Sequence, residues 1–375
     1  MMRAHAGSGA LDSWEQLMQV TVVGSGNGGM AVGFEWAQHG HRVALYGDPA
    51  HPDNLDAVRA EGGITSHGRL EGFAPVASSG TDLAAAMDGA EVVFVVGPAF
   101  ATEDFGRALA PHLRAGMTVV ICPGSCAGAL AFRNAAGLAP DDASVVVGET
   151  STLPYAARAD GKGTVHVFHR FDAGLFAAAV PRSGTAALVE ILRQVYSSIE
   201  AAATVFQTSL QNGNPVIHPA VTLLNAALID RTGGDFRFYE EGVTASVGRL
   251  MKAVDDERLA IAAALGVTIR SEPDIGVAQG YMTESNYTTA YSRAPGFLGI
   301  KAPATLDSRY LTEDVGYSLV FFTDLARRLG VPTPTMDAII DITSVVLARD
   351  LRAESARTLR SLGLDQLSTE QLLTL

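Results

Sequence analysis

Gln19–Ala31, with the sequence QVTVVGSGNGGMA, indicates the fold of the first half of the chain. Its valine-rich beginning is typical of a strand buried on both faces. Gly24, Gly26 and Gly29 then follow with the spacing G-x-G-x-x-G. In this pattern the first glycine permits a tight turn, the second lets a pyrophosphate approach the backbone, and the third lets helix and strand pack closely. The phosphates would lie at the positive N-terminus of the new helix.

The residues after the glycines support this interpretation. Met30–His39 is compatible with a helix, and Arg42–Tyr46 (RVALY) has the composition of a second strand. The whole segment is therefore a β-turn-α-β unit of the length that a dinucleotide-binding fold requires. We predict that Ser25, Asn27 and Gly28 complete the cofactor cradle together with the spaced glycines.

The end of the second predicted strand bears on the choice of cofactor. An acidic residue there would bind the ribose hydroxyls, but Gly47 comes first and Asp48 follows. Asp48 could reach a 2′-hydroxyl, which favours NAD, whereas a 2′-phosphate would find a small glycine and open space. Arg42 and His51 are the nearest cations in the sequence. Both NAD and NADP therefore remain open.

Further apolar segments alternate with helical ones along the first half. The predicted strands are Glu91–Val96, Met117–Cys122 and Ser144–Val147, with more strand in Lys162–Ala179 to close the sheet. Such alternation predicts an α/β fold, a Rossmann-type doubly wound parallel sheet. Ligands bind at the carboxyl ends of such strands, so Pro98, Ala99 and Gly124 are expected to border the cofactor. The alternative is that these residues only form tight strand-to-helix turns.

Composition limits the function classes. A chain of 375 residues exceeds the usual size of one core, and we expect a flexible extension (1–17), a dinucleotide-binding domain (18–200) and a helical domain (201–375). The formal net charge of -13 argues against a nucleic-acid partner. No apolar run is long enough to span a membrane, and no signal peptide is evident, so a cytoplasmic enzyme is expected.

No metal site is expected. Cys122 and Cys126 are the only cysteines, and a lone C-x-x-x-C pair fits two buried, reduced thiols better than a zinc site or a disulfide framework. His166 and His169 would point to opposite faces of a strand, which argues against a shared metal.

Helical periodicity dominates from about residue 206 onward. The expected helices are Gly242–Leu265, Asp314–Leu329 and Pro334–Arg349, whose large apolar faces suggest a homodimer. Between the first two lies Ile269–Arg309, a long irregular segment rich in Tyr, Ser, Thr, Pro and Gly. Loops of that length are usually functional or disordered, and the tyrosines favour a substrate-facing lid.

Two segments in this half contain side chains suited to chemistry. In Gln211–Pro219 (QNGNPVIHP) the second proline fits the first position of a helix, which would place His218 at the helix N-terminus. In Ser308–Val315 (SRYLTEDV) an acidic helix start follows Arg309. Taken alone, a histidine is more often structural than catalytic, and the second segment resembles an ordinary capped helix with a solvated arginine.

Together these motifs resemble the opine dehydrogenases, that is, the octopine/nopaline dehydrogenase family with the bacterial N-carboxyalkyl amino acid dehydrogenases. The resemblance rests on the glycine turn, N-P-x-x-H-P and R-Y-x-x-E-D-V in this order and runs from about Val20 to Arg349. Further matching stretches are Gly148–Arg158, Asp255–Gly266 and Gly330–Pro334.

The resemblance implies a Rossmann domain followed by an all-α domain, and small-molecule substrates. Its members reductively condense an amine with an α-keto acid and consume a reduced nicotinamide cofactor. By motif, His218 would be the catalytic acid/base, Asp314 its carboxylate partner and Arg309 the group that binds the keto-acid carboxylate. The resemblance also implies that Thr152, Tyr155, Asn212 and Thr222 contact the substrate. A keto- or hydroxy-acid reductase of related fold, or a nucleotide-binding protein without catalysis, are the alternatives.

Overall fold

The valine-rich segments of the first half form the centre of an eight-stranded sheet in the computed structural model, which describes residues 17–50, 52–139 and 141–375. The predicted extension therefore lies, except for Leu17, outside the described residues. The strand order is β12-β11-β8-β7-β6-β1-β2-β5, and every pairing is parallel except β11 with β8. Its strands are β1 Gln19–Val23, β2 Arg42–Tyr46, β5 Ser78–Gly80, β6 Val92–Val95, β7 Thr118–Ile121, β8 Val146–Thr150, β11 Phe176–Val180 and β12 Glu200–Ala201. The predicted doubly wound sheet is confirmed.

A second, four-stranded sheet lies beside the first, in the order β4-β3-β10-β9. Its strands are β3 Gly63–Gly68, β4 Gly72–Pro75, β9 Tyr155–Ala159 and β10 Thr164–Arg170. The expectation that all of Lys162–Ala179 closes the main sheet is wrong, because only β11 joins that sheet. Helix α1 (Asn27–Gln38) packs between the two sheets, so its residues from Gly29 to Ala37 are all buried.

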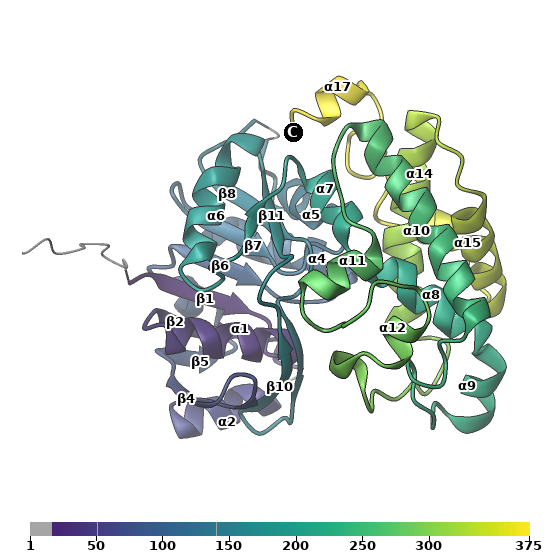
Figure 1. Ribbon diagram of the computed structural model, residues 1–375. Helices are drawn as coiled ribbons and strands as arrows, with labels where there is room; N and C mark the ends of the chain where they lie inside the picture. The colour runs from purple at the N-terminus through teal and green to yellow at the C-terminus, as the bar shows by residue number, and fades with distance from the viewer. Residues whose placement is uncertain (1–16, 51, 140) are drawn as a thin grey trace, which may run out of the picture.

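The other helices of the first half cover the main sheet or the small one (Figure 1). They are α2 Asp53–Glu61, α3 Leu83–Met87, α4 Thr102–Leu109, α5 Gly128–Ala135 and α6 Thr185–Arg193. Cys122 and Cys126 are buried and free, as the sequence predicts.

The second half is helical, as expected. Its helices are α7 Val205–Gln211, α8 Asn214–Leu224, α9 Ala226–Thr232, α10 Ala245–Leu265, α11 Glu272–Ala278, α12 Thr289–Ser292, α13 Arg309–Thr312, α14 Val320–Leu329, α15 Pro334–Leu347, α16 Leu351–Glu354 and α17 Thr369–Leu372. Gly266 and Gly330 end α10 and α14 in the left-handed conformation, as helix-stop glycines do. No helix in the described residues is long and apolar enough to cross a membrane.

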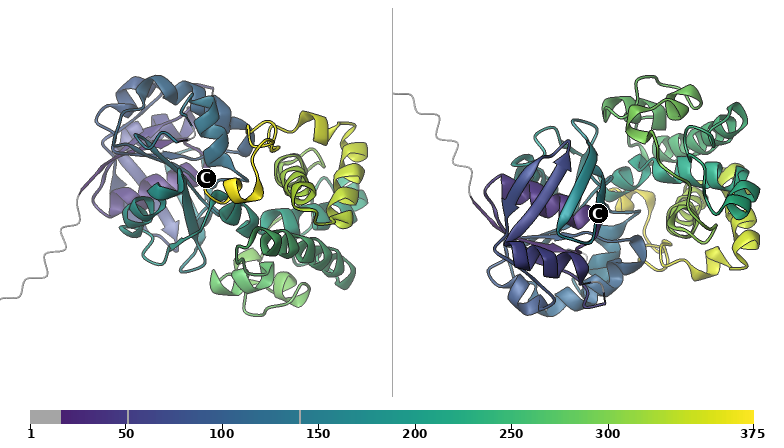
Figure 2. Two further views of the ribbon diagram at one scale, coloured as in Figure 1. Left: turned by 90° about the horizontal axis from the view of Figure 1, so that it is seen from above. Right: turned by 90° about the horizontal axis from the view of Figure 1, so that it is seen from below.

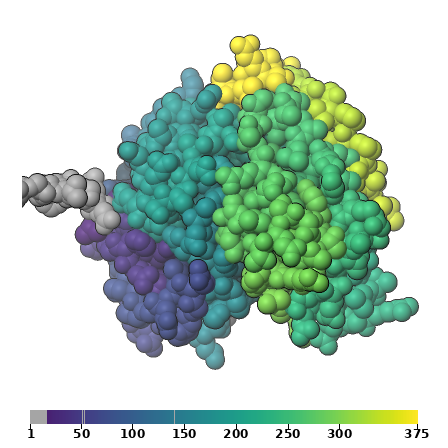
Figure 3. Space-filling model, in the orientation of Figure 1, coloured from purple at the N-terminus to yellow at the C-terminus, as the bar shows by residue number. Residues whose placement is uncertain are grey.

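The chain ends between the two domains (Figure 2). The carbonyl of Leu375 accepts a hydrogen bond from the backbone N–H of Arg182 beside β11, and Asn134 on α5 donates to the carbonyl of Leu362. The tail of the predicted helical domain therefore lies on the dinucleotide-binding domain. Figure 3 shows the same two domains in contact along a continuous seam, with the green surface of the second domain against the teal surface of the first.

Candidate active site

The turn between β1 and α1 has the geometry of an anion cradle. Gly24 has a φ of +120°, and a Cβ there would lie 2.1 Å from the carbonyl oxygen of Val96. A Cβ on Gly29 would lie 1.7 Å from the carbonyl oxygen of Gly24. Gly26 has no heavy atom within 4 Å of its Cβ position and begins α1 without a side-chain cap. The open space and the uncapped N–H groups fit a pyrophosphate.

The other predicted cradle residues hold the turn in place. Asn27 accepts a hydrogen bond from the N–H of Ala159 on β9, and the carbonyl of Ser25 accepts one from Asn54 on α2. A Cβ on Gly28 would lie 3.0 Å from a methyl of Leu153, so this glycine allows the loop after β8 to approach. These contacts position the backbone of the turn.

The space predicted at Gly47 is occupied. A Cβ there would lie 2.3 Å from the hydroxyl of Ser25, so the close packing of Ser25 requires a glycine at this position, and the choice between NAD and NADP stays a prediction. Asp48 follows β2, is exposed, and accepts a hydrogen bond from the N–H of Ala50 through Oδ1. Arg42 begins β2 and so lies at the other end of the strand, and His51 lies outside the described residues.

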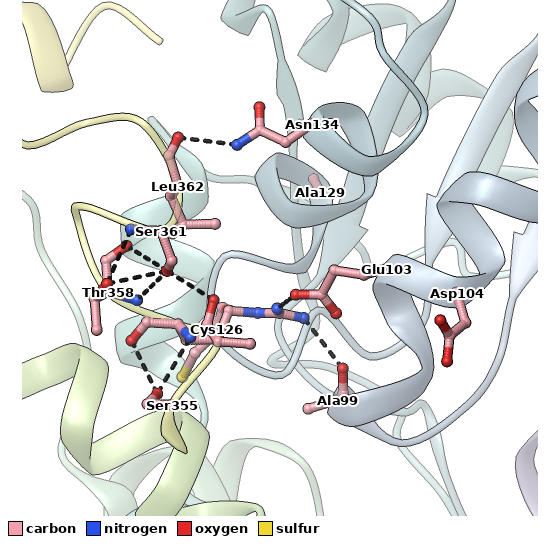
Figure 4. A network of polar contacts seen from close by, with 12 residues as sticks. Ala99, Glu103, Asp104, Cys126, Ala129, Asn134, Ser355, Thr358, Ser361 and Leu362 are labelled. Carbon is pink, nitrogen blue, oxygen red and sulfur yellow. Dashed lines mark hydrogen bonds and ion pairs between the residues drawn. The ribbon is translucent and has the colours of Figure 1, made fainter. Parts of the chain in front are cut away.

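An arginine from the chain's tail connects the turns after β6 and β7. Figure 4 shows Ala99 and Cys126 of these turns near Glu103. Arg357 is 0% exposed and donates to the carbonyls of Ala99 and Cys126 at 3.2 and 3.1 Å. It also pairs with Glu103 on α4. Pro98 precedes Ala99 at the carboxyl end of the sheet, where the sequence places a cofactor edge.

A buried carboxyl, Glu149 at the end of β8, joins the sheet to the helical domain. It accepts hydrogen bonds from the N–H of Ala129 in the first turn of α5 and from the hydroxyls of Thr208 and Ser209 on α7. Burial raises its pKa to about 7. Glu149 also occupies the space in front of Gly124, where a Cβ would lie 2.5 Å from the carboxyl carbon. Gly124 is therefore required by packing.

Replacing Glu149 with Gln should flatten the pH dependence of stability. Its pKa is raised from 4.5 to about 7 in the folded state, so the stabilisation present below pH 4.5 is lost as the pH rises through about 7. The shift corresponds to about 3 kcal/mol. Urea unfolding at about pH 5 and about pH 8.5 measures it, and the wild type should lose more stability over this interval than Glu149→Gln. Equal losses in the two proteins would disprove the assignment.

His218 lies between a carboxylate and a hydroxyl. Its Nδ1 is 2.8 Å from Oδ2 of Asp314, and its Nε2 is 3.1 Å from the hydroxyl of Tyr239. A carboxylate only accepts, so Nδ1 carries a proton and Nε2 of the neutral ring accepts from Tyr239. The ring of Tyr310 stacks on the imidazole at 3.9 Å. The structure thus brings His218 and Asp314 together, from positions 96 residues apart in the chain.

Two local features orient this pair. Helix α8 begins at Asn214, with Pro215 in its first turn and Pro219 inside it. The prediction that Pro219 begins the helix is therefore wrong, because Pro215 is the N-terminal proline. Asp314 begins a π-helical turn, Asp314–Leu319, where an α-helix is expected. Such turns occur frequently at functional sites.

Arg309 pairs with Glu313 and not with Asp314. Its Nε lies 2.9 Å from Oε2 of Glu313, and its side chain is 65% exposed. The other oxygen of Glu313 accepts from the hydroxyl of Ser125 in the loop after β7. Glu313 therefore links Arg309 to the dinucleotide-binding domain. The spacing of four residues between Arg309 and Glu313 is a sequence signal for this ion pair.

A pocket of about 80 Å³ opens beside Tyr239 between the two domains. The first domain contributes Thr152 and Phe171, and the second contributes residues around α8 and α11. Of the predicted substrate residues, only Thr152 lines this pocket. The side chain of Asn212 caps the N–H of Asn214, and the buried Thr222 follows His218 by one helical turn.

Tyr155 lies elsewhere, inside the first domain. Its hydroxyl donates to Glu35 on α1 and contacts the hydroxyl of Tyr196, while Arg170 pairs with the same carboxylate at 2.8 Å. The proposed substrate contact of Tyr155 is therefore replaced by a buried polar cluster behind α1.

Tyr239 has no distinguishing signal in the sequence, because an aromatic residue in FRFYEEG looks like a core residue. The sequence-based prediction did not include Tyr239. It also missed Glu149, although the matching stretch GETSTLPYAAR contains it. His166 is exposed and His169 is buried, on opposite faces of β10. Among the residues the structure describes, no group of three or more His, Cys, Asp or Glu side chains could hold a metal.

Two different family models match the two halves of the chain. A family model described as NAD/NADP octopine/nopaline dehydrogenase, alpha-helical domain, matches residues 201–347. A model of the N-terminus of NAD-dependent glycerol-3-phosphate dehydrogenase matches residues 19–124. An opine dehydrogenase of Arthrobacter sp. (strain 1C) is 33% identical over 92% of this chain and 95% of its own length. The protein ocs of Agrobacterium tumefaciens (strain Ach5) is 28% identical over 93% of this chain and 96% of its own.

Solved structures share the fold. Octopine dehydrogenase in complex with NADH and agmatine has a TM-score of 0.77 at 20% identity, over 95% of this chain and 98% of that one. The same enzyme with NADH and pyruvate has a TM-score of 0.74 at 22% identity, with the same coverage. Yersinopine dehydrogenase bound to NADP+ has a TM-score of 0.68 at 16% identity, over 95% of this chain and 97% of that one.

Proposed function

The chain belongs to the opine dehydrogenase family of NAD(P)-dependent oxidoreductases, and on that basis we propose that it joins an amine to an α-keto acid by reductive condensation. The product is a secondary amine, and the reverse oxidation uses the same groups. The observation that carries this proposal is the row Asp314–His218–Tyr239, which ends at a pocket lined by both domains.

His218 serves as base and then as acid. An ammonium substrate first gives a proton to Nε2 through the space that the Tyr239 hydroxyl borders, and its freed electron pair forms the bond to the keto carbon. The second nitrogen proton moves to the former keto oxygen to give a carbinolamine. The imidazolium then donates its proton to that hydroxyl, which leaves as water, and a C=N bond forms. Such proton transfer contributes ~10²–10⁴-fold to the rate.

Asp314 supports both forms of the imidazole. Its carboxylate accepts from Nδ1, which keeps the lone pair of the neutral ring on Nε2, the atom that faces Tyr239. The same carboxylate stabilises the imidazolium after Nε2 takes a proton. The glycine turn would hold the reduced cofactor, NADH or NADPH, which would supply the hydride for the C=N carbon.

Arg309 bonds Glu313 through Nε and Nη2, and its other edge, Nη1 with Nη2, would bind the carboxylate of the keto acid through two parallel bonds. Replacing it with Lys, which keeps the charge but loses the fork, should raise KM for the keto acid about 10-fold or more and leave KM for the cofactor unchanged. Steady-state kinetics with one substrate varied at a time measures both constants.

Arg158 on β9 is the competing candidate for the carboxylate site. Burial raises the pKa of Tyr310, and the nearby guanidinium of Arg158 opposes that rise, so this second cation also faces the site. If Arg158→Lys raises KM for the keto acid and Arg309→Lys does not, the carboxylate site belongs to β9.

The experiment that tests the proposed reaction follows NAD(P)H absorbance with pyruvate, with and without an added amine. Oxidation of NAD(P)H that requires both pyruvate and the amine supports reductive condensation. Oxidation by the keto acid alone, at an equal rate, would instead identify a 2-keto acid reductase of related fold. Tight NADH binding without turnover on any pair would identify a protein that binds nucleotide without catalysis.

A further inference from the structure

Glu272, the first residue of α11, places a buried carboxyl in the pocket beside Tyr239. Its side chain is almost fully buried, and its Oε1 accepts from the hydroxyl of Tyr281 at 2.9 Å. Its Oε2 is buried and has no hydrogen-bond partner within the described parts of the chain. A buried carboxyl oxygen without a partner is costly, so its position in a ligand pocket requires an explanation.

No ion pair holds this carboxyl within the described residues. Against the larger effect of burial, the charge of Arg258 lowers the pKa of Glu272, but this fully buried guanidinium pairs with Asp255 and donates to the carbonyls of Leu210 and Arg270. No Lys or Arg lines the pocket among the residues that the structure describes. Glu272 therefore takes part in no ion pair among the described residues.

Aromatic rings form the walls around Glu272. The ring of Phe297 stacks on that of Tyr239, with 4.0 Å between the ring centroids, and its centroid is 4.8 Å from that of Tyr281. The ring centroids of Tyr281 and Phe171 are 5.8 Å apart. Aromatic faces attract cations, and the attraction is strongest where water is excluded. Rings and a carboxyl together favour an ammonium group and disfavour an anion.

Resting on the proposed function, we infer that this pocket receives the side chain of the amine substrate and that Glu272 selects one that ends in an ammonium group. Tyr239 lines the pocket and bonds His218, so a substrate side chain held there leaves its reacting nitrogen beside the imidazole. Glu272 is thus a specificity-determining residue, and the pocket is the amine subsite.

The volume limits the length of that side chain. A cavity of 150 Å³ holds benzene, and this pocket has about 80 Å³. It therefore has room for about three non-hydrogen atoms beyond the reacting centre. The diamino acid 2,4-diaminobutyrate presents such a side chain, norvaline is its neutral counterpart of equal size, and aspartate is an anionic one.

Glutamine has the same shape as the protonated side chain of Glu272. Burial raises the pKa of Glu272 to about 8, so at neutral pH the group is mostly protonated until a cation enters the pocket. Glu272→Gln keeps that neutral shape, and we expect it to fold as the wild type does. It cannot become a carboxylate, so it should lose only the attraction for an ammonium group.

The test compares the three amino acids in the wild type, Glu272→Gln and Asp274→Asn, with pyruvate and saturating NAD(P)H. Asp274 lies on the exposed side of α11, so Asp274→Asn removes a carboxylate of the same helix outside the pocket. Glu272→Gln should lower kcat/KM for 2,4-diaminobutyrate about 10- to 100-fold, mostly by raising KM. This is the effect expected when one hydrogen bond to a charged group is lost. Norvaline should change by less than about 3-fold, and Asp274→Asn should match the wild type.

Other outcomes are equally decisive. Equal effects of Glu272→Gln on 2,4-diaminobutyrate and norvaline, or an equal fall in Asp274→Asn, would overturn the subsite. Calorimetric binding of 2,4-diaminobutyrate to the NAD(P)H complex of each protein gives the same comparison without turnover. Absence of turnover with every amine would count against the proposed reaction, and weaker binding to Glu272→Gln alone would still support the subsite.

Discussion

Replacing His218 with Ala is expected to lower kcat by at least ~100-fold while the reduced cofactor still binds. The imidazole lies between Asp314 and Tyr239, and it transfers the protons of amine addition and of water loss in the proposed reaction. The glycine turn that would hold the pyrophosphate belongs to the other domain, so we expect the cofactor to bind without this side chain.

Steady-state kinetics gives kcat, and quenching of protein fluorescence by NADH gives the dissociation constant of the cofactor. His166→Ala is the matched control, because His166 is an exposed histidine on β10. It should retain the activity of the wild type. Turnover of His218→Ala equal to that of His166→Ala would remove His218 from the mechanism, and loss of NADH binding would assign it a structural role.

Replacing Arg357 with Met should lower the free energy of unfolding by about 3–5 kcal/mol, the usual result when one partner of a buried ion pair is removed. Arg357 is fully buried and is hydrogen-bonded to the carbonyls of Ala99 and Cys126 as well as paired with Glu103. Met fills much of the same volume, so the loss would come from the polar groups left without a partner. The two carbonyls belong to turns at the carboxyl end of the sheet, so weaker cofactor binding is also expected.

Urea unfolding of Arg357→Met and of Arg360→Met measures this effect. Arg360 is exposed on the same tail, and its replacement should change stability by less than about 0.5 kcal/mol. Equal losses of unfolding free energy in the two variants would show that Arg357 contributes no more to stability than an exposed arginine does. In that case the tail would not connect the turns after β6 and β7.

The sequence predicts those parts of the fold that depend on neighbouring residues. The glycine spacing predicts the turn before α1, and the β-branched runs predict β1, β6 and β7, because strand period and turn chemistry are local properties. Gly266 and Gly330 likewise end α10 and α14 where expected.

The misses depend on contacts between distant residues. The small sheet pairs β3 with β10 in parallel, across about a hundred residues that no local pattern connects. Tyr155 on β9 bonds Glu35 on α1 because the tertiary fold packs that helix against that strand. Glu272 is likewise an ordinary helix-start glutamate in the sequence, and only the folded chain surrounds it with aromatic rings.

Isotope transfer tests the proposed reaction most directly. The enzyme is given pyruvate, an amine and NADH that carries deuterium on the transferable position of C4, and the product is analysed by mass spectrometry and NMR. The proposed condensation predicts one deuterium on the former keto carbon, now bonded to the amine nitrogen in a secondary amine. Deuterium in a 2-hydroxy acid, with the amine recovered unchanged, would contradict it.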